Sequence, residues 1–407
     1  MAVTLFTDKK KCSGCGACVN ACPRDAIALV PDEDGFLYPQ IDEKRCAECG
    51  LCQKVCHYGD DTPKAFPAAC YAAAARDDEM LGRSASGGVF AVLARDTLAA
   101  GGAVYGAAMS METGLPVTAH VRIDDLSDLP ALQGSKYVHS DTGLTFRQVK
   151  ADLCEGRRVL YSGTPCQIAG LKGYLGREYE DLLTVELICH GVPSGKMFAD
   201  FIATLAEKRK LPVTGFHFRT KTRGQSMVSC AEYKKADGSI LRERKNGNLY
   251  SYMYYFLKSY IYRSNCYSCP YAANERRADI TIGDFWGFHE EYPTLGAGCR
   301  LNNGRGVSCV LVNSARGREW FREVSGGLEL LETEFEKIAR HNAQLSAPSS
   351  CPGVRDAILE IYRSRGYTGV EQHYRRTTGR KRLAYMAASL VPKGAKRLVK
   401  RVIGIVK

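Results

Sequence analysis

Two runs of four cysteines lie within the first 60 residues of this 407-residue chain and constrain its fold more than any other feature. Both runs have the spacing CxxCxxCxxxC; Pro23 follows the first, and His57 takes the place of proline after the second. The eight residues are Cys12, Cys15, Cys18, Cys22, Cys46, Cys49, Cys52 and Cys56. A 4Fe-4S cube takes one thiolate at each iron, and so tight a loop places three ligands around one cluster. The sequence therefore predicts two 4Fe-4S clusters in this segment.

The pairing of the two runs follows from the usual pattern of two-cluster ferredoxins. In such proteins the fourth cysteine of each run binds the cluster of the other run. We therefore expect one cluster to be held by Cys12, Cys15, Cys18 and Cys56. We expect the second to be held by Cys46, Cys49, Cys52 and Cys22. Zinc knuckles are the alternative, but zinc sites seldom use two runs of four cysteines at this spacing.

Composition and cysteine usage indicate a folded protein of a reducing compartment. The chain is 45% hydrophobic and 25% charged, which is ordinary for a folded protein. Its 18 cysteines include runs with metal-ligand spacing, and we recognise no signal peptide, so we expect the cytoplasm rather than secretion. The most apolar long stretch, residues 89–108, contains Arg95, Asp96 and several glycines. We therefore expect no membrane-spanning helix.

The net charge of +12 is concentrated in the C-terminal tail. Residues 371–407 hold eleven Lys and Arg against one Glu, whereas residues 1–60 hold seven basic and nine acidic residues. We therefore expect no nucleic-acid partner. Residues 380–407 alternate basic and apolar residues, which is typical either of a solvated extension or of a helix in peripheral contact with an anionic membrane.

The main body is expected to alternate strands and helices, the pattern of an α/β domain. It begins after a linker at residues 58–67, which hold two Pro, two Asp and a Gly. The expected strands are 103–109, 117–123, 159–162, 182–189, 280–285 and 307–313. The expected helices are 88–100, 142–155, 167–175, 195–210, 248–263 and 315–324. A polar hairpin at 227–243, turning at 236–238, adds antiparallel sheet.

Four further cysteines stand in distinctive motifs of the body. Cys166 follows Ser-Gly-Thr-Pro, Cys189 precedes His-Gly-Val-Pro, and Cys266 and Cys269 form a CxxC motif followed by proline. The threonine and proline before Cys166 suit the cap and first turn of a helix, whose positive field would favour a thiolate. Spacing alone leaves open a metal site, a redox-active CxxC and a catalytic thiol at Cys166.

Seven segments of the body together resemble one known family, in the same order. They are residues 84–90 (SASGGVF), 134–138 (GSKYV), 140–143 (SDTG), 163–167 (GTPCQ), 188–193 (ICHGVP), 266–269 (CYSC) and 279–287 (DITIGDFWG). The family is the beta subunit of coenzyme F-420 hydrogenase and dehydrogenase, in the variant that carries an N-terminal ferredoxin. The resemblance covers about residues 10 to 345.

The resemblance implies a flavoprotein that binds FAD and one further 4Fe-4S cluster. It implies Cys166, Cys189, Cys266 and Cys269 as ligands of that cluster. It also implies these flavin contacts: Ser86, Gly87, Gly88, Gly134, Ser135, Lys136 and Tyr137. The small residues before the helix expected at 88–100 would let backbone N–H groups approach a pyrophosphate, although such turns also serve as plain caps. A lysine near the isoalloxazine would stabilise the reduced anion.

Two further features have both a functional and a structural interpretation. His190 would either protonate a substrate or flavin, or donate a hydrogen bond to the sulfur of its neighbour Cys189. Residues 284–287 close an expected strand and would line the flavin pocket, but their two aromatic residues also suit the core.

The sequence thus predicts an α+β and α/β chain, with a two-cluster ferredoxin fold at 1–60 and a mixed α/β flavoprotein body. The body comprises a flavin-binding part at 68–150 and a part with the third cluster at 151–345, and 346–407 form a helical and basic tail. We expect an oxidoreductase that relays electrons between these clusters and a flavin, which exchanges hydride with a substrate such as a deazaflavin coenzyme. One alternative is an electron-transfer subunit that serves a redox partner protein or a small-molecule electron carrier. Another is a flavin-dependent reductase of a different substrate, including one linked to glycan metabolism.

Overall fold

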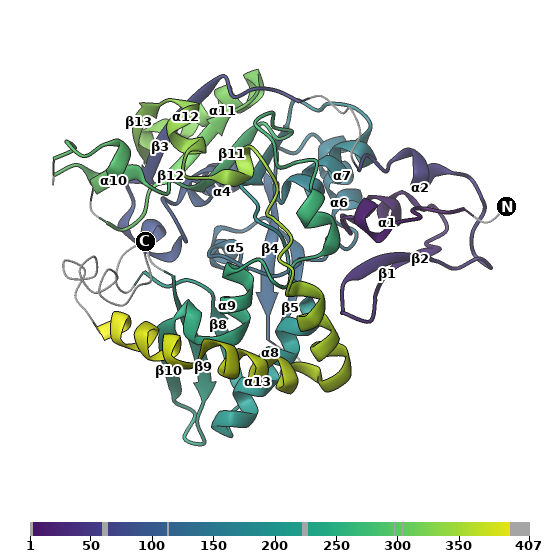
Figure 1. The fold of residues 1–407 in the computed structure, drawn as a ribbon. Coiled ribbons are helices and arrows are strands. Elements are labelled where there is room, and N and C mark those ends of the chain that lie inside the picture. The colour runs from purple at the N-terminus through teal and green to yellow at the C-terminus, as the bar shows by residue number, and fades with distance from the viewer. Residues whose placement is uncertain are drawn as a thin grey trace.

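The structure, a computed structural model, describes residues 3–58, 64–111, 114–221, 227–296, 298–302 and 304–390 (Figure 1). Its α-helices are α1 Ala17–Ala21, α2 Leu51–Lys54, α3 Asp78–Arg83, α4 Val89–Ala99, α5 Leu129–Leu132, α6 Thr145–Cys154, α7 Pro165–Leu175, α8 Gly195–Arg209, α9 Ser251–Leu257, α10 Phe288–Glu291, α11 Ala315–Val324, α12 Phe335–Ala339 and α13 Arg355–Leu390. Its strands are β1 Ile27–Pro31, β2 Leu37–Ile41, β3 Ala69–Ala75, β4 Ala103–Ser110, β5 Val117–Ile123, β6 Val159–Gly163, β7 Leu182–Leu187, β8 Val213–His217, β9 Val228–Lys234, β10 Ile240–Asn246, β11 Ile280–Asp284, β12 Ser308–Val312 and β13 Leu328–Thr333.

The largest sheet has eight strands in the order β13-β3-β12-β11-β7-β6-β4-β5. The central strands β11, β7, β6 and β4 are parallel to one another. The flanking strands pair antiparallel on both sides. The carboxyl ends of β6, β7 and β11 therefore meet at one edge of the sheet, which is where ligands bind in open α/β sheets.

Side chains of this sheet alternate between two buried cores, as the two-residue period of a strand requires. On one face, Leu160 of β6 and Leu183 of β7 pack with α4 and α11. On the other face, Tyr161 of β6 and Leu182 of β7 pack with α6 and α7. Helices thus cover both faces of the parallel strands, as such sheets generally require.

A second layer consists of the sheet β10-β9-β8 with α8, α9 and α13 around it (Figure 1). Its core is aromatic: Phe201 of α8, Phe216 of β8, Tyr252 of α9 and Tyr367 of α13 are all buried in one cluster. The long helix α13 turns at Gly366 and at a second glycine further on, where the backbone is not helical. Its first half therefore follows α8 toward the N-terminal domain.

The N-terminal domain packs directly on α6 and α7 through α1 (Figure 1). Gly170 and Gly173 lie on the α7 face that it contacts. A Cβ added at Gly170 would lie 2.8 Å from Sγ of Cys15, and one at Gly173 would lie 2.2 Å from the ring of His57. The hydroxyl of Thr142 also donates a hydrogen bond to the carbonyl of Cys15, at 2.9 Å. These two glycines therefore allow a close approach that side chains would prevent.

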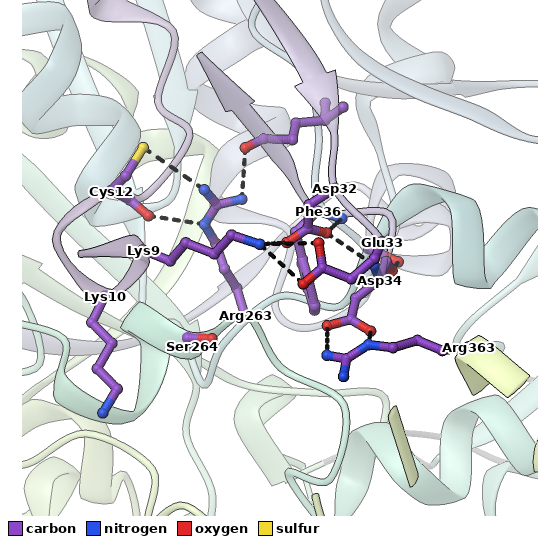
Figure 2. Close-up of polar contacts among 12 residues, drawn as sticks. Lys9, Lys10, Cys12, Asp32, Glu33, Asp34, Phe36, Arg263, Ser264 and Arg363 are labelled. Carbon is purple, nitrogen blue, oxygen red and sulfur yellow. Dashed lines mark hydrogen bonds and ion pairs between the residues drawn. The ribbon is translucent and has the colours of Figure 1, made fainter. Parts of the chain in front are cut away.

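The tip of the β1–β2 hairpin is held in place by ion pairs (Figure 2). Lys9 donates to Asp32 at 2.8 Å and to Glu33 at 3.2 Å. Arg363 of α13 donates two hydrogen bonds to Asp34, at 2.8 and 2.7 Å. The three carboxylates are close enough together to resemble a cation site, but each is already paired with a lysine or an arginine. The C-terminal helix thus fastens the N-terminal domain to the body.

The mixed α/β fold expected from the sequence is confirmed. The expected strands 103–109 and 117–123 and the helix 315–324 coincide closely with β4, β5 and α11, and the hairpin turning at 236–238 is formed by β9 and β10. Strands from 68–150 and from 151–345 pair within one sheet. None of the described helices is long and apolar enough to cross a membrane.

The structure differs from the expectations in several elements; β1, β2, β8 and β13 were also not expected, and two further differences have a clear physical reason. Strand β3 was not expected, because its ACYAAAA sequence is rich in alanine, which is depleted in strands; it is placed by pairing with β12 and β13. The helix expected over 248–263 ends at Leu257, because Ser259 adopts a positive φ of 59°. Residues 380–390 are helical, and the rest of the basic tail, 391–407, lies outside the described residues.

We expect Arg363→Met to loosen the attachment of the N-terminal domain. The change leaves Asp34, whose side chain is 7% exposed, without its charged partner, and should lower the free energy of unfolding by about 1–2 kcal/mol. Urea unfolding would measure this, and hydrogen exchange should show faster exchange at the hairpin tip. Arg365→Met, a change at an exposed arginine nearby, is the matched control. Equal stability of the two variants would contradict the role of this ion pair.

Candidate iron-sulfur sites and a basic cavity

The N-terminal cysteines surround two separate cavities. The middle cavity, so named for its place between two others, is lined by Cys12, Cys15, Cys18 and Cys56. The outer cavity is lined by Cys22, Cys46, Cys49 and Cys52. Each cavity thus receives three cysteines of one run and the fourth cysteine of the other run, which is the crossed arrangement expected for two-cluster ferredoxins.

The surroundings of these sulfurs also fit a thiolate-bound cluster. The backbone N–H of Ala26 donates to Sγ of Cys22 at 3.2 Å, and that of Glu48 donates to Sγ of Cys46 at 3.5 Å. Burial raises the pKa of Cys15 to about 12, so its free thiol would stay protonated near neutral pH. Four converging sulfurs with backbone donors around them are suited to an iron-sulfur cube, which holds its ligands as thiolates.

The four cysteines of the body line a third, inner cavity. Cys166 lies in the first turn of α7, directly after β6, and Cys189 follows the end of β7. Cys266 lies in a 3-10 helix, Ser264–Ser268, and Cys269 closes it. The capping turn before α7 is formed as expected, since the backbone N–H of Thr164 donates to the side-chain oxygen of residue 167 at 3.0 Å. Ends of two parallel strands and one loop therefore bring these four sulfurs together.

The protonation of these thiols argues against a free reactive cysteine. Burial raises the pKa of all four, that of Cys266 to about 12 and that of Cys269 to about 11. Burial therefore outweighs the helix field that was expected to favour a thiolate at Cys166. A buried thiol of this kind is unreactive on its own, whereas a bound metal ion deprotonates it.

The middle and inner cavities share part of their walls. Ser13, Cys166 and Tyr271 line both. Because Cys166 occupies one wall of each, a group bound in the inner cavity would lie next to a group bound in the middle one. The three cysteine-lined cavities thus form a series that runs from the N-terminal domain into the body.

A buried ion pair adjoins the inner cavity. Arg276, which lines the cavity, donates to Glu186 at 2.6 Å; the two side chains are 2% and 0% exposed. Arg276 also donates to the carbonyls of Tyr271 and Ala273, at 3.1 and 2.8 Å. Its positive charge is thus neutralised by a carboxylate, and its hydrogen bonds hold the loop that follows Cys269.

A fourth cavity, of about 340 Å³, is lined mainly by polar and basic residues. This volume lies within the range of about 300–1,000 Å³ that is typical of small-molecule sites. We call it the basic cavity; its basic lining residues are Arg83, His217, Arg219, Lys221, Arg242 and Arg244. Glu232 is the acidic residue among those that line it. An anionic ligand is the chemistry that this wall favours.

Lys221 is the most unusual of these cations. Its ammonium donates to the carbonyls of Leu81, at 2.6 Å, and Ser86. Burial lowers the pKa of Lys221 to about 7, and the neighbouring Arg219 contributes to this lowering. Its charge therefore changes in the physiological pH range.

Only some of the residues expected to contact a flavin line this cavity. Gly134 lines it, together with Ser84 and Ala85 of the first resembling segment. The N–H of Gly87 is occupied by a hydrogen bond to Oγ of Ser308, at 2.9 Å. Gly88 lies next along the chain and caps α4.

Most of the other residues expected to contact a flavin form hydrogen bonds or ring contacts within the protein. The hydroxyl of Ser86 donates to the carbonyl of residue 307 at 2.9 Å. The ammonium of Lys136 donates to two carbonyls, at residues 131 and 133, both at 2.9 Å, and burial lowers its pKa to about 7. The ring of Tyr137 stacks on Phe256 with 4.4 Å between the ring centroids, and Ser135 lies beside Lys136 in the chain.

Asp284 connects the inner cavity to the basic cavity. It accepts two hydrogen bonds from Arg219, at 2.5 and 3.1 Å. It also interacts electrostatically with His190, which lines the inner cavity, although burial lowers the pKa of that histidine. A neutral ring near pH 7 does not favour the acid role considered for His190. Of the aromatic residues 285 and 286, Phe285 is 2% exposed and belongs to the core.

The sequence did not point to the basic residues that line the basic cavity. Arg219 and Lys221 lie outside the resembling segments, and an isolated arginine gives no pattern that predicts its burial. The two glycines of α7 carried a weak signal, because glycine is unfavourable within a helix and its presence there usually has a packing reason. Of the remaining cysteines, Cys309 is buried in β12, and Cys299 does not line the inner cavity.

Two parts of the chain are similar to known protein families. Residues 11–59 match a family model described as a 4Fe-4S dicluster domain. Residues 156–337 match the model described as the C terminus of the coenzyme F420 hydrogenase/dehydrogenase beta subunit. An uncharacterized ferredoxin of Methanocaldococcus jannaschii is 42% identical over 38 residues, a match that spans 9% of this chain and 49% of that protein. A solved structure of the F420-reducing NiFe hydrogenase complex from Methanosarcina barkeri aligns with 17% identity and a TM-score of 0.38, covering 77% of this chain and 92% of the other.

The dicluster domain and the cysteine-lined cavities define an iron-sulfur electron-transfer protein. The body gives the more particular assignment. Residues 156–337 belong to the family of the coenzyme F420 hydrogenase/dehydrogenase beta subunit, and a 4Fe-4S dicluster domain precedes them in the chain.

We expect Arg276→Met to destabilise the protein strongly. Removing one partner of a buried ion pair leaves the other charge unpaired, which typically costs about 3–5 kcal/mol in the free energy of unfolding. The double variant Arg276→Met with Glu186→Met removes both charges and should recover most of that loss. Urea unfolding followed by circular dichroism would compare the two. A double variant no more stable than the single one would show that the ion pair is not the cause.

Proposed function

We propose that this chain is an iron-sulfur flavoprotein oxidoreductase that relays electrons between its clusters and a flavin. The observation that carries the proposal is the series of cavities: outer, middle and inner, with Cys166 in the walls of the last two. Asp284 interacts with one lining residue of each of two cavities: Arg219 of the basic cavity and His190 of the inner cavity. Such an order is what a relay requires, because each electron acceptor must lie next to its donor.

The twelve cysteines would hold three 4Fe-4S clusters, four for each cavity. The N-terminal domain would hold two, and Cys166, Cys189, Cys266 and Cys269 would hold the third. When bound, the clusters supply one-electron transfer, and a flavin supplies the coupling of two single electrons and a proton to one hydride.

We propose FAD in the basic cavity. Arg219, Arg242 and Arg244 line this cavity, and guanidinium groups suit phosphate oxygens geometrically. Arg219 is paired with Asp284 and Arg242 with Glu232, so Arg244 and Lys221 would supply positive charge for a pyrophosphate beyond these two pairs. The segments around residues 84–88 and 134–137, which the family resemblance implies, border this cavity on one side. Asp284 orients Arg219 through two hydrogen bonds, so this charge would be fixed before the ligand arrives.

The substrate would be a hydride acceptor or donor, and the family description points to a deazaflavin coenzyme. A link to glycan metabolism is an alternative that rests on the resemblance alone. Contact of the basic tail with an anionic membrane likewise rests on the sequence alone, because residues 391–407 lie outside the described residues.

One observation favours a second function, an electron-transfer subunit that serves a partner protein. Cys49 of the outer cavity is exposed, and its neighbour Leu51 is 42% exposed. An exposed ligand beside an apolar side chain is a suitable point for electrons to enter from another protein. Turnover of a small-molecule substrate by the isolated chain would favour the oxidoreductase, and turnover only with a second, co-purifying polypeptide would favour this alternative.

We expect anaerobically purified protein to contain about twelve irons, since each cube holds four, and about one FAD. Cys166→Ser should reduce iron to about eight and prevent flavin reduction by a low-potential donor, while the N-terminal clusters remain reducible. Iron, sulfide and flavin analysis with absorption spectra would test both. Cys309→Ser, a change at a buried cysteine outside the cavities, is the matched control. About eight irons and no flavin in the unsubstituted chain would refute the proposal.

We expect flavin affinity to fall as the pH rises through 7. Lys221 has a pKa of about 7, so its positive charge is present below that pH and lost above it. The loss of one charge near a phosphate should weaken binding about tenfold between pH 6 and 8, which corresponds to about 1.4 kcal/mol. Lys221→Met should bind flavin weakly at both pH values and show little pH dependence. Flavin fluorescence would measure the affinities, with Lys235→Met, at an exposed site, as the control. An unchanged pH profile in Lys221→Met would contradict this role.

A further inference from the structure

Arg263 places a buried positive charge beside the middle cavity (Figure 2). The residue is 1% exposed and lies in the loop that leads to Cys266. Its guanidinium donates to the carbonyls of Cys12 and Leu37, at 3.0 and 2.8 Å, and to Sγ of Cys12 at 3.8 Å. Its carbon lies 3.9 Å from the ring centroid of Tyr38. A residue of the body thus contributes directly to a site in the N-terminal domain.

This guanidinium has no carboxylate partner among the described residues. A buried charge without a counter-ion is costly, so its neutral contacts alone do not account for its position. The nearest anion that it could face is a thiolate of Cys12. A cube bound by four thiolates supplies that negative charge, and it becomes one unit more negative when it accepts an electron.

Arg276 at the inner cavity and two arginines near the outer cavity are neutralised or exposed. Arg276 at the inner cavity is paired with Glu186. Arg147 donates to the carbonyl of Cys22 at 2.6 Å, near the outer cavity, but its guanidinium is paired with Asp25 at 2.8 Å. Arg24, which lines the outer cavity, is exposed to solvent, where its field is weakened. The middle cavity therefore differs from the outer cavity in having beside it a buried cation with no carboxylate partner among the described residues.

We propose that Arg263 raises the reduction potential of the middle cluster above that of the outer cluster, so that electrons arriving at the exposed end are drawn inward. The inference rests on the clusters of the proposed function but not on the flavin. Reduction adds negative charge, and a fixed cation at hydrogen-bond distance from a ligand sulfur stabilises the reduced state more than the oxidised state. The outer cluster lies further from this charge.

The surrounding contacts hold Arg263 in place for this role. The backbone N–H of Arg263 donates to the carbonyl of Val192 at 2.9 Å, which ties it to the segment after Cys189. Lys9 also lies over the ring of Tyr38, but it forms ion pairs with Asp32 and Glu33, so its positive charge is compensated. Arg263 is therefore a positioning residue whose charge acts on the cluster through the sulfur of Cys12.

The test is a redox titration of the full-length, cluster-loaded protein, monitored by electron paramagnetic resonance. Arg263→Gln should lower the midpoint potential of the middle cluster relative to the outer one. We expect at least a tenfold change in the equilibrium constant for electron transfer between them, which is about 59 mV for a one-electron step. Arg263→Lys keeps the charge and should retain most of the difference. Cys12→Ser identifies the resonance of the middle cluster, because it changes one of that cluster's ligands.

Arg147→Gln is the matched control, since Arg147 also donates to a cysteine carbonyl but is paired with a carboxylate; it should leave the difference in potential nearly unchanged. An unchanged difference in Arg263→Gln, or an equal loss in Arg263→Lys, would overturn the proposal. If Arg263→Gln fails to hold its clusters, the midpoint potentials of the two clusters in the unsubstituted chain provide the test. An outer cluster with a higher midpoint potential than the middle cluster would overturn the proposal. Missing iron in the unsubstituted chain would instead refute the proposed function.

Discussion

The close packing of the N-terminal domain on α7 is the contact on which the rest of the arrangement depends. Gly170 and Gly173 remove two side chains from this helix, and Cys15 and His57 occupy the space. Cys166 lies one turn before Gly170 on the same helix, so the same contact that joins the two domains also brings the middle cavity to the inner one. An alanine at either glycine would separate the domains before it disturbed either fold, because the clash is with the partner domain.

Electrostatics then distinguishes sites that share the same ligands. Three cavities are each lined by four cysteines, yet the buried arginines beside them differ. Glu186 neutralises Arg276 at the inner cavity, whereas Arg263 at the middle cavity faces carbonyls, sulfur and an aromatic ring but no carboxylate among the described residues. Clusters with identical thiolate ligands can have very different potentials, because hydrogen bonds and nearby charge set them. The arginines, rather than the cysteines, therefore distinguish these cavities from one another in their electrostatics.

The sequence was informative where residues act through local spacing and uninformative where they act through the fold. The grouping of the N-terminal cysteines follows from a spacing that only a few structures satisfy, and the expected strands 103–109 and 117–123 follow from apolar runs. Strand β3 could not be recognised, because its pairing partners, not its alanines, place it. Arg263 could not be recognised either, since its burial against Tyr38 depends on how two domains distant in the sequence pack together.

The ion pair between Asp34 and Arg363 joins residues that are 329 positions apart, and this separation has a consequence for biosynthesis. At about 5–20 residues per second, roughly 16–66 s pass between the synthesis of the hairpin and that of the helix that fastens it. During this interval the N-terminal domain is present without this ion pair. The hairpin is therefore available to fold long before its partner helix exists, so the ion pair stabilises the docked domain rather than starting its folding.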